Sequence, residues 1–184
     1  MKTIAKAAFA VAALVLAATA DIRAQDHAAF DVGGMKFTRP ADWESIEPSS
    51  SMRKAQFKIK DPKTEASAEV VFFQFPGGAG TVKANVERWL GQFQEPRDKI
   101  NSKVEEVKIG KVTITYVQAE GTYSGGMPGR PSPPMKDYAL IGAIISSESS
   151  SAADVFVRMT GPKELVKTSA ADFKKMIESG PKKD

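Results

Sequence analysis

The sequence predicts an α+β domain with a mostly antiparallel sheet of about six to seven strands, sandwiched between helices. Three observations lead to this fold class. Several short segments alternate apolar and polar residues with the period of a half-buried strand. Two segments, residues 68–75 and 138–145, are apolar on both faces, so each needs cover on both sides of the sheet. Two amphipathic segments with helical spacing supply that cover.

The strand segments follow from period-two alternation and from the turn residues between them. Residues 53–60 alternate apolar side chains with lysine and glutamine, and Asp61-Pro62-Lys63-Thr64 forms the turn that follows. Arg39-Pro40 ends an earlier strand, because proline lacks a backbone donor and restricts the residue before it. The predicted strands are residues 35–38, 43–46, 53–60, 68–75, 112–116, 138–145 and 155–159, with a further candidate at 104–109.

Apolar residues at helical spacing predict two helices. The first follows the glycines at 77, 78 and 80, and Pro96 ends it. The second follows Thr160-Gly161-Pro162, where Thr160 is expected to cap the helix and Pro162 suits its first turn. Gly180-Pro181 ends this second helix. The apolar stripes are Val82, Val86, Trp89, Leu90 and Phe93 in the first helix, and Leu165, Val166, Ser169, Phe173, Met176 and Ile177 in the second.

The first twenty residues have the pattern of a cleavable export signal. Lys2 and Lys6 form a positive segment, residues 7–18 form an uncharged apolar run, and Ala18-Thr19-Ala20 is a small-residue cleavage site. A run of twelve residues is too short to cross a hydrocarbon core of about 30 Å as a helix. The sequence therefore predicts a signal peptide at 1–20, a disordered leader at 21–33, a single domain at 34–180 and a tail at 181–184, with the mature protein periplasmic or secreted.

Composition excludes several classes of protein. The chain has no cysteine, which excludes a lipid-modified lipoprotein and a disulfide scaffold. Beyond the predicted signal no apolar stretch approaches eighteen residues, so no membrane span is expected. Loss of Lys2 and Lys6 lowers the formal charge from +4 to +2, so the high isoelectric point gives no argument for a nucleic-acid partner.

Three segments together carry a family resemblance. They are Gly34-Met35-Lys36-Phe37 through Pro40 to Trp43, the mid-chain helix with Trp89, and the last strand into Thr160-Gly161-Pro162 with Phe173. Over most of residues 34–180 the chain resembles the PsbP-like proteins, and among them the small exported bacterial members of unassigned role. The resemblance implies the α/β/α sandwich shared with the Mog-type Ran-binding proteins, and accessory, partner-binding work rather than catalysis. No family functional residue carries over, because no motif here holds one.

The residues form no recognisable catalytic site, and we expect no enzyme activity. The only histidine, His27, lies in the predicted leader, where packing cannot orient it as a general base. Zinc sites built on histidine and cysteine are excluded with it. The serine runs at 49–51 and 146–151 have the composition of flexible loops. Glu105 and Glu106 are neighbours on a candidate strand and point to opposite faces, which disfavours an acid pair.

We expect no cofactor and no metal. Gly77-Gly78-Ala79-Gly80 lies between a strand and a helix, where backbone N–H groups could receive an anion, but Thr81-Val82-Lys83 follows in place of a phosphate-loop ending. Thioethers suit Cu(I), yet Met127 and Met135 share a loop without a repeat. The other methionines of the mature chain, expected as core residues, are Met35, Met52, Met159 and Met176.

Two functional hypotheses remain. The first, which we favour, is an interaction module without chemistry of its own that binds an envelope or extracellular protein through a loop. The second is a carrier that holds a small apolar or amphipathic ligand between a helix and the sheet, which would need a cavity of about 300 Å³ or more. The aromatic residues that would line such a cavity are Phe72, Phe73, Phe75, Trp89 and Phe93.

The segment 121–136 is the predicted contact surface of the first hypothesis. Its four glycines and four prolines exclude a continuous helix or central strand, so it is expected to be a long exposed loop. Long loops in compact domains tend to be functional or disordered, and a hairpin extension without function is the alternative. The candidate partner-binding residues are Tyr123, Met127 and Arg130, because protein interfaces enrich these residue types.

Overall fold

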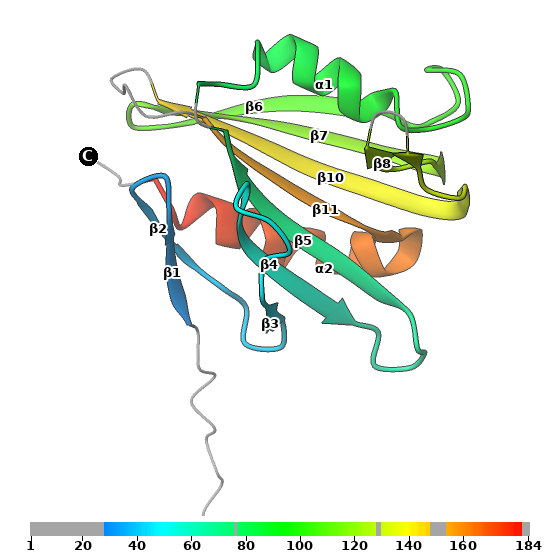
Figure 1. Cartoon of the computed structure of the whole chain (residues 1–184), viewed down its shortest axis with the longest axis horizontal. Coiled ribbons are helices and arrows are strands. Elements are labelled where there is room, and N and C mark those ends of the chain that lie inside the picture. Colours follow the sequence, from blue (N-terminus) through cyan, green and yellow to red (C-terminus); the bar gives the residue numbers. More distant parts are fainter. Residues whose placement is uncertain (1–27, 76, 128–129, 148–153, 182–184) are drawn as a thin grey trace, which may run out of the picture.

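The computed structural model describes residues 28–75, 77–127, 130–147 and 154–181 (Figure 1). The predicted signal peptide and His27 lie outside these residues. Seven strands form one antiparallel sheet in the order β3-β4-β5-β11-β10-β7-β6, which confirms the predicted α+β class and the antiparallel sheet. The strands are β3 (Glu44–Ile46), β4 (Arg53–Lys60), β5 (Ser67–Gln74), β6 (Lys103–Ile109), β7 (Val112–Tyr123), β10 (Met135–Ser147) and β11 (Val155–Pro162).

A separate hairpin of β1 (Ala29–Val32) and β2 (Met35–Thr38) precedes this sheet. The prediction that the disordered leader extends to residue 33 is therefore wrong for its last residues. Gly33 and Gly34 have φ angles of +62° and +76°, which suits the two-residue turn of a tight hairpin. Phe30 stacks on Phe37 and packs against the core, so burial of apolar area stabilises β1. The polar composition of the residues around it does not indicate this burial.

Two helices occur among the described residues, α1 (Val82–Leu90) and α2 (Lys163–Glu178). Thr81 caps α1, since its Oγ1 accepts a hydrogen bond from the Ala84 N–H at 3.1 Å. The prediction that Thr160 caps α2 is wrong. Thr160 pairs with Leu140 and Glu69 inside β11. The strand runs directly into the helix, and its last residue, Pro162, occupies the N-cap position without a side-chain capping bond.

The two helices pack against opposite faces of the sheet (Figure 1). On one face Phe173 and Met176 of α2 join Phe72 and Val157, and the β1–β2 hairpin covers part of the same face. On the other face the α1 core is made of Val86, Trp89, Leu90, Phe93, Ile100, Val117, Ala119, Tyr123, Leu140, Ile144 and Phe156. One helix on each face is less helical cover than the sandwich that the sequence predicts.

The predicted loop at 121–136 is shorter than expected. Strand β7 continues to Tyr123 and β10 begins at Met135, with a register shift between Met135 and Tyr138. Between them β8 (Gly126–Met127) and β9 (Arg130–Pro131) form a small two-stranded ribbon. Glu95 holds the end of β7, because its carboxylate oxygens accept the Thr122 N–H at 2.9 and 2.8 Å. Hydrogen bonding from the side chain of Thr122, and then from its backbone N–H, lowers the pKa of Glu95.

No helix in the described parts of the chain combines the length and the hydrophobicity needed to cross a membrane.

Candidate functional site

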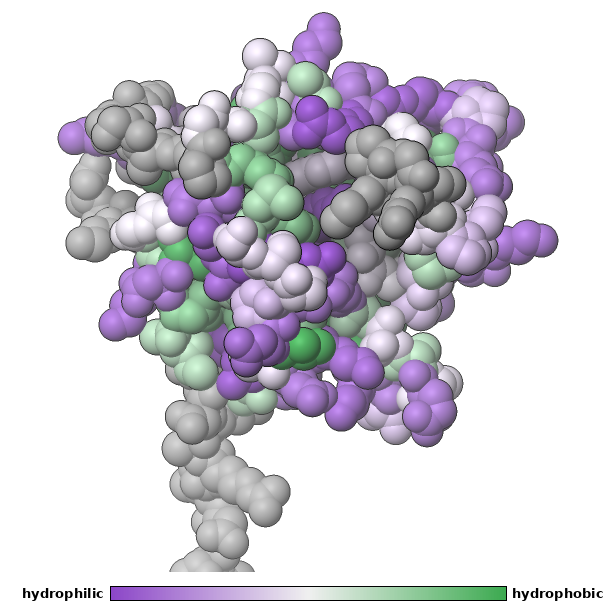
Figure 2. All heavy atoms as spheres, viewed as in Figure 1, coloured by the Kyte–Doolittle hydropathy of each residue, from purple (hydrophilic) through white to green (hydrophobic). Residues whose placement is uncertain are grey.

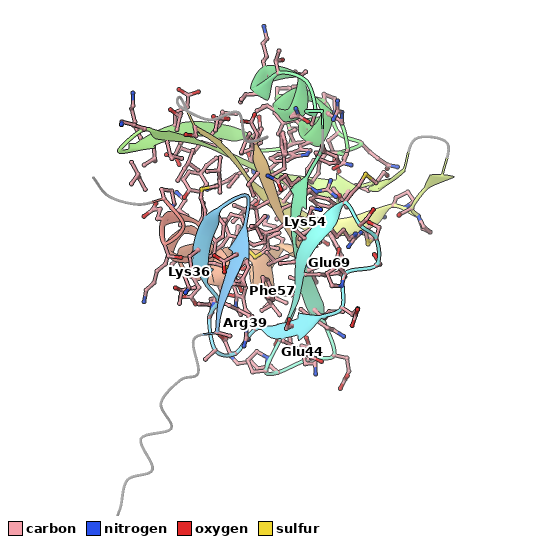
Figure 3. The ribbon with its side chains drawn as sticks, turned by 60° about the vertical axis from the view of Figure 1, so that its left-hand side comes forward. Lys36, Arg39, Glu44, Lys54, Phe57 and Glu69 are labelled. Carbon is pink, nitrogen blue, oxygen red and sulfur yellow. The ribbon has the colours of Figure 1, made fainter. Side chains whose placement is uncertain are left out.

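Helix α1 covers only part of its face of the sheet. Its apolar side chains pack over β7, β10 and part of β11, while the neighbouring part of the same face, over β3, β4 and β5, carries mainly polar residues around the buried Val71. In Figure 3 Phe57 lies between the β1–β2 hairpin and the sheet, whereas Glu69 lies on the far side of β4 from that hairpin. We call this surface the open face; its residues are Arg53, Gln56, Lys58, Glu69, Phe73 and Arg158.

A partly buried aromatic ring, that of Phe73, lies at the edge of the open face next to α1. Arg53 from β4 and Arg158 from β11 lie over the ring of Phe73, each with its guanidinium carbon 5.6 Å from the ring centroid. Both contacts are within the range of cation–π attraction. Antiparallel pairing fixes this geometry, because β5 lies between β4 and β11. Arginine and aromatic residues are the types that protein interfaces enrich.

The two arginines of this group differ in their partners. Arg53 forms an ion pair with Glu69 at 3.1 Å, and Glu69 also accepts a hydrogen bond from Gln56 Nε2 at 2.7 Å. Arg158 instead donates to the neutral Gln92 Oε1 at 2.9 Å. Gln56 is only 8% exposed, and its Oε1 is a buried acceptor without a hydrogen-bond partner. The open face therefore contains Arg53, whose charge is balanced by Glu69, and Arg158, which is held by an uncharged amide. It also contains Gln56 Oε1, a buried acceptor without a partner.

Two hollows lie on this side of the sheet. The first, of about 190 Å³, lies where α1 meets β5 and β11, and the second, of about 310 Å³, lies farther along the same strands. The first is lined by Phe73, Phe75, Asn85, Arg88, Trp89, Gln92, Gly126, Phe156 and Arg158, and the second by Ile46, Lys58, Ser67, Ala68, Glu69, Met135, Tyr138 and Thr160. The molecular side drawn in Figure 2 is mainly hydrophilic, with smaller apolar patches.

The structure corrects the role predicted for Tyr123. Its side chain is 5% exposed, packs edge-on against Phe93 and stacks on Tyr138, so it is a core residue and not an exposed contact. Its hydroxyl donates to Gln92 Oε1 at 3.2 Å, and burial raises the pKa of Tyr123. The glycines around Tyr123 suggested a loop, but position 123 continues the inward alternation of Ala119 in β7.

Met127 and Arg130 are brought together by the β8–β9 ribbon. They are directly opposite in the antiparallel register, so their backbones are neighbours at its tip. Gly126 in the same ribbon lines the first hollow, which places the ribbon beside the open face. The sequence predicts a loop where this ribbon lies, and it does not indicate the open face, because no motif marks Arg53, Phe73 and Arg158. The strands β4 and β5 are consecutive, but β11 is distant from both in sequence.

Glu105 and Glu106 take part in separate contacts. Glu105 forms ion pairs with Lys103 and, at 3.4 Å, with Lys174, and both lysines lower the pKa of Glu105. Glu106 accepts a hydrogen bond from Thr115 Oγ1 at 3.5 Å on the opposite face. Within the described residues no group of three or more histidine, cysteine, aspartate or glutamate side chains could hold a metal ion.

The glycine-rich turn before α1 has a structural explanation. Gly77, Gly78 and Gly80 have φ angles of +87°, +87° and +85°, which side chains other than glycine rarely adopt. Thr81 then caps the helix. Of the methionines predicted as core, Met159 and Met176 are buried, but Met52 is 46% exposed just before β4, so that prediction is wrong for Met52.

The aromatic set predicted for a ligand carrier does not converge. Phe72 lies in the core on the α2 face, opposite Phe73, because neighbouring strand residues point to opposite faces. Phe93 packs against Tyr123, and it is not among the described residues that line the first hollow. The hollow between α1 and the sheet, about 190 Å³, is smaller than the range of about 300–1,000 Å³ usual for small-molecule sites.

A scan of the sequence against protein-family models finds no match. A search of curated proteins finds no similar sequence.

Proposed function

We propose that this chain is an exported, non-enzymatic interaction module that binds an envelope or extracellular protein through the open face and the β8–β9 ribbon beside it. The observation that carries the proposal is the half-exposed ring of Phe73 between two arginines. Binding a protein over this ring would bury its remaining apolar area and strengthen both cation–π contacts by removing water. Arginine and aromatic anchors of this kind contribute most of the energy of many protein interfaces.

The proposal includes the PsbP-like α/β/α architecture. Helices on opposite faces of a seven-stranded antiparallel sheet support it, although each face has one helix among the described residues. The family resemblance stands on the short segments around Trp43, Trp89 and Thr160. Fold alone does not assign a function, so the interaction role rests on the open face rather than on the family.

The carrier alternative has less support. Its cavity would lie between α1 and the sheet, where the hollow is about 190 Å³. The larger hollow of about 310 Å³ is bordered by charged residues such as Lys58 and Glu69, and so does not suit an apolar ligand. A surface for a protein partner accounts for both hollows.

Cleavage of the predicted signal peptide would give the exported protein a defined N-terminus. If the first twenty residues are a signal peptide, intact-mass measurement of the periplasmic or secreted protein should give the mass of the chain beginning at Asp21. The control is the same chain with Lys2 and Lys6 replaced by glutamate, which should slow export and retain the precursor. Recovery of the unprocessed wild-type chain from the cytoplasm would contradict the proposed localisation.

Replacing residues 126–133 with a short Gly-Ser linker should leave the melting temperature nearly unchanged, because loop length contributes little to stability. Gly125 is kept, since a side chain there would place its Cβ 2.5 Å from the ring of Tyr123. We expect this variant and Phe73→Ser to lose partners that the parent captures from envelope extract. A matched control replaces the β4–β5 turn, residues 62–65, in the same way. Undiminished capture by both variants would show that the partner binds elsewhere.

A further inference from the structure

The first hollow is an electropositive pocket. Two charged residues occur in its described lining, Arg88 from α1 and Arg158 from β11, and both carry a positive charge. Each guanidinium is held by an amide oxygen: Arg88 donates to Asn85 Oδ1 at 2.9 Å, and Arg158 donates to Gln92 Oε1 at 2.9 Å. An amide oxygen orients a guanidinium without neutralising it, so the positive charge of the pocket remains available to an anion.

Both amides are themselves held in place. Asn85 is 2% exposed, and its Nδ2 donates to the carbonyl oxygens of Ala79 at 3.0 Å and Thr81 at 2.9 Å. Gln92 Oε1 also accepts the hydroxyl of Tyr123 at 3.2 Å. The donors that face the pocket are therefore positioned before any ligand arrives, which reduces the entropy that binding would cost.

The rest of the lining is mainly aromatic. We call the four rings at its base the aromatic floor: Phe73, Phe75, Trp89 and Phe156. Within it Phe75 and Trp89 both pack edge-on against Phe156, with ring centroids 5.6 and 6.4 Å away. A site with two cations and an aromatic floor suits a ligand that joins a negative charge to an apolar group.

We propose that this pocket binds the free C-terminal carboxylate of a partner protein whose last side chain is apolar. Arg88 and Arg158 bind the carboxylate, and the aromatic floor contacts the side chain. This inference rests on the proposed interaction function and names the chemistry of the partner. A C-terminal residue carries its charge and its apolar group on the same carbon, so both fit a pocket of about 190 Å³.

The surroundings of the pocket favour a chain end over a small molecule. The second hollow follows along the same strands: Arg158 lines the first, and Thr160, the next residue on that face of β11, lines the second. Residues that precede the C-terminus of a bound peptide could therefore continue across the sheet toward Lys58 and Glu69. A free aromatic acid would leave this surface unoccupied.

The test uses isothermal titration calorimetry of the purified chain with the peptide acetyl-Gly-Ser-Gly-Phe bearing a free carboxylate. We expect its C-terminal amide, and the acid peptide ending in Gly, each to bind at least about tenfold more weakly, because each lacks one of the two recognised groups. Affinity for the acid peptide should also fall with added salt. Equal affinity for acid and amide, or no binding of the acid, would overturn the proposal.

Variants assign the binding to this pocket. Arg88→Gln and Arg158→Gln should each weaken the acid peptide at least about fivefold. Arg88 is exposed and bonds to Asn85 alone among the contacts described, so its variant should fold even if loss of Arg158 disturbs Gln92. Arg97→Gln is the matched control: Arg97 is exposed, pairs with Glu87, and lies outside the pocket lining. Equal losses in all three variants would indicate a nonspecific charge effect and overturn the assignment.

Two further ligands distinguish a C-terminal carboxylate from that of a free small acid and from that of an internal aspartate side chain. 3-Phenylpropionate should bind more weakly than the peptide, and tight binding of it alone would make the pocket a small-molecule site. Acetyl-Gly-Asp-Phe-Gly-amide carries its charge on an internal residue and should not compete, so competition would overturn the C-terminal assignment. Loss of partner capture in the linker and Phe73→Ser variants without peptide binding would leave the interaction function standing and remove only this inference.

Discussion

Trp89→Ala is expected to lower the free energy of unfolding by about 3–5 kcal/mol, which is the usual cost of truncating a buried tryptophan. Trp89 is 6% exposed and is the largest side chain that α1 places against the sheet. It packs edge-on against Phe156 and lies directly over Gly142 of β10. Alanine would leave a cavity between the helix and two central strands, and α1 has only nine residues with which to compensate.

Chemical denaturation of the two proteins measures this difference. Lys83→Ala is the matched control, because Lys83 is exposed on the same helix and its truncation should change stability by no more than about 0.5 kcal/mol. An unchanged midpoint for Trp89→Ala would mean that α1 does not pack on the sheet as described.

The sheet was largely predictable from the sequence because its central strands are apolar on both faces. The apolar residues on both faces of 138–145 indicate a strand covered on both sides, and the structure places β10 in the interior of the sheet. The ends of the elements were less predictable. Threonine is a residue type that often caps helices, but Thr160 is held in β11 by pairing with β5 and β10. Strand pairing of this kind overrides the local preference of a residue for a helix cap.

The errors at residues 29–33 and 121–123 have different causes. The polar, alanine-rich composition of residues 21–33 predicts a disordered leader, and the glycines and prolines of residues 121–136 predict a loop. In the structure Gly33 and Gly34 turn a hairpin, and Gly121 lies within β7. The alternation of Phe30 with Val32 was the available signal for the first, and that of Ala119 with Tyr123 was the signal for the second. Burial of Tyr123 could have been inferred from that alternation.

The open face could not have been predicted at the level of residues. Arg53 and Phe73 lie on the consecutive strands β4 and β5, but Arg158 is distant from both in the chain. It meets them because β11 pairs with β5 as well as with β10, the strand that precedes it in sequence. Strand order is set by long-range packing, which period-two patterns do not specify. The sequence predicts a loop next to this surface, because glycine and proline favour turns and loops locally, but it does not predict the pairing of β8 with β9.

Gly142→Val should be strongly destabilising, and its effect should depend on Trp89. A Cβ built at Gly142 would lie 2.2 Å from Cζ3 and 2.5 Å from Cε3 of Trp89, which is closer than atoms can pack. Because β10 pairs on both sides with β7 and β11, the strand cannot move away, and the helix must shift instead. Overpacking of this kind costs about 1–3 kcal/mol or more.

The double variant separates a steric effect from a general requirement for glycine. With Trp89 replaced by alanine, the cavity can receive the new side chain, so Gly142→Val should be close to neutral or stabilising in that background. Strand preference also favours valine over glycine by up to about 1 kcal/mol once the clash is gone. Denaturation of the four proteins of this cycle gives the coupling energy, which we expect to be about 2–3 kcal/mol. Additive effects of the two substitutions would mean that glycine is needed at position 142 for a reason other than the approach of the Trp89 ring.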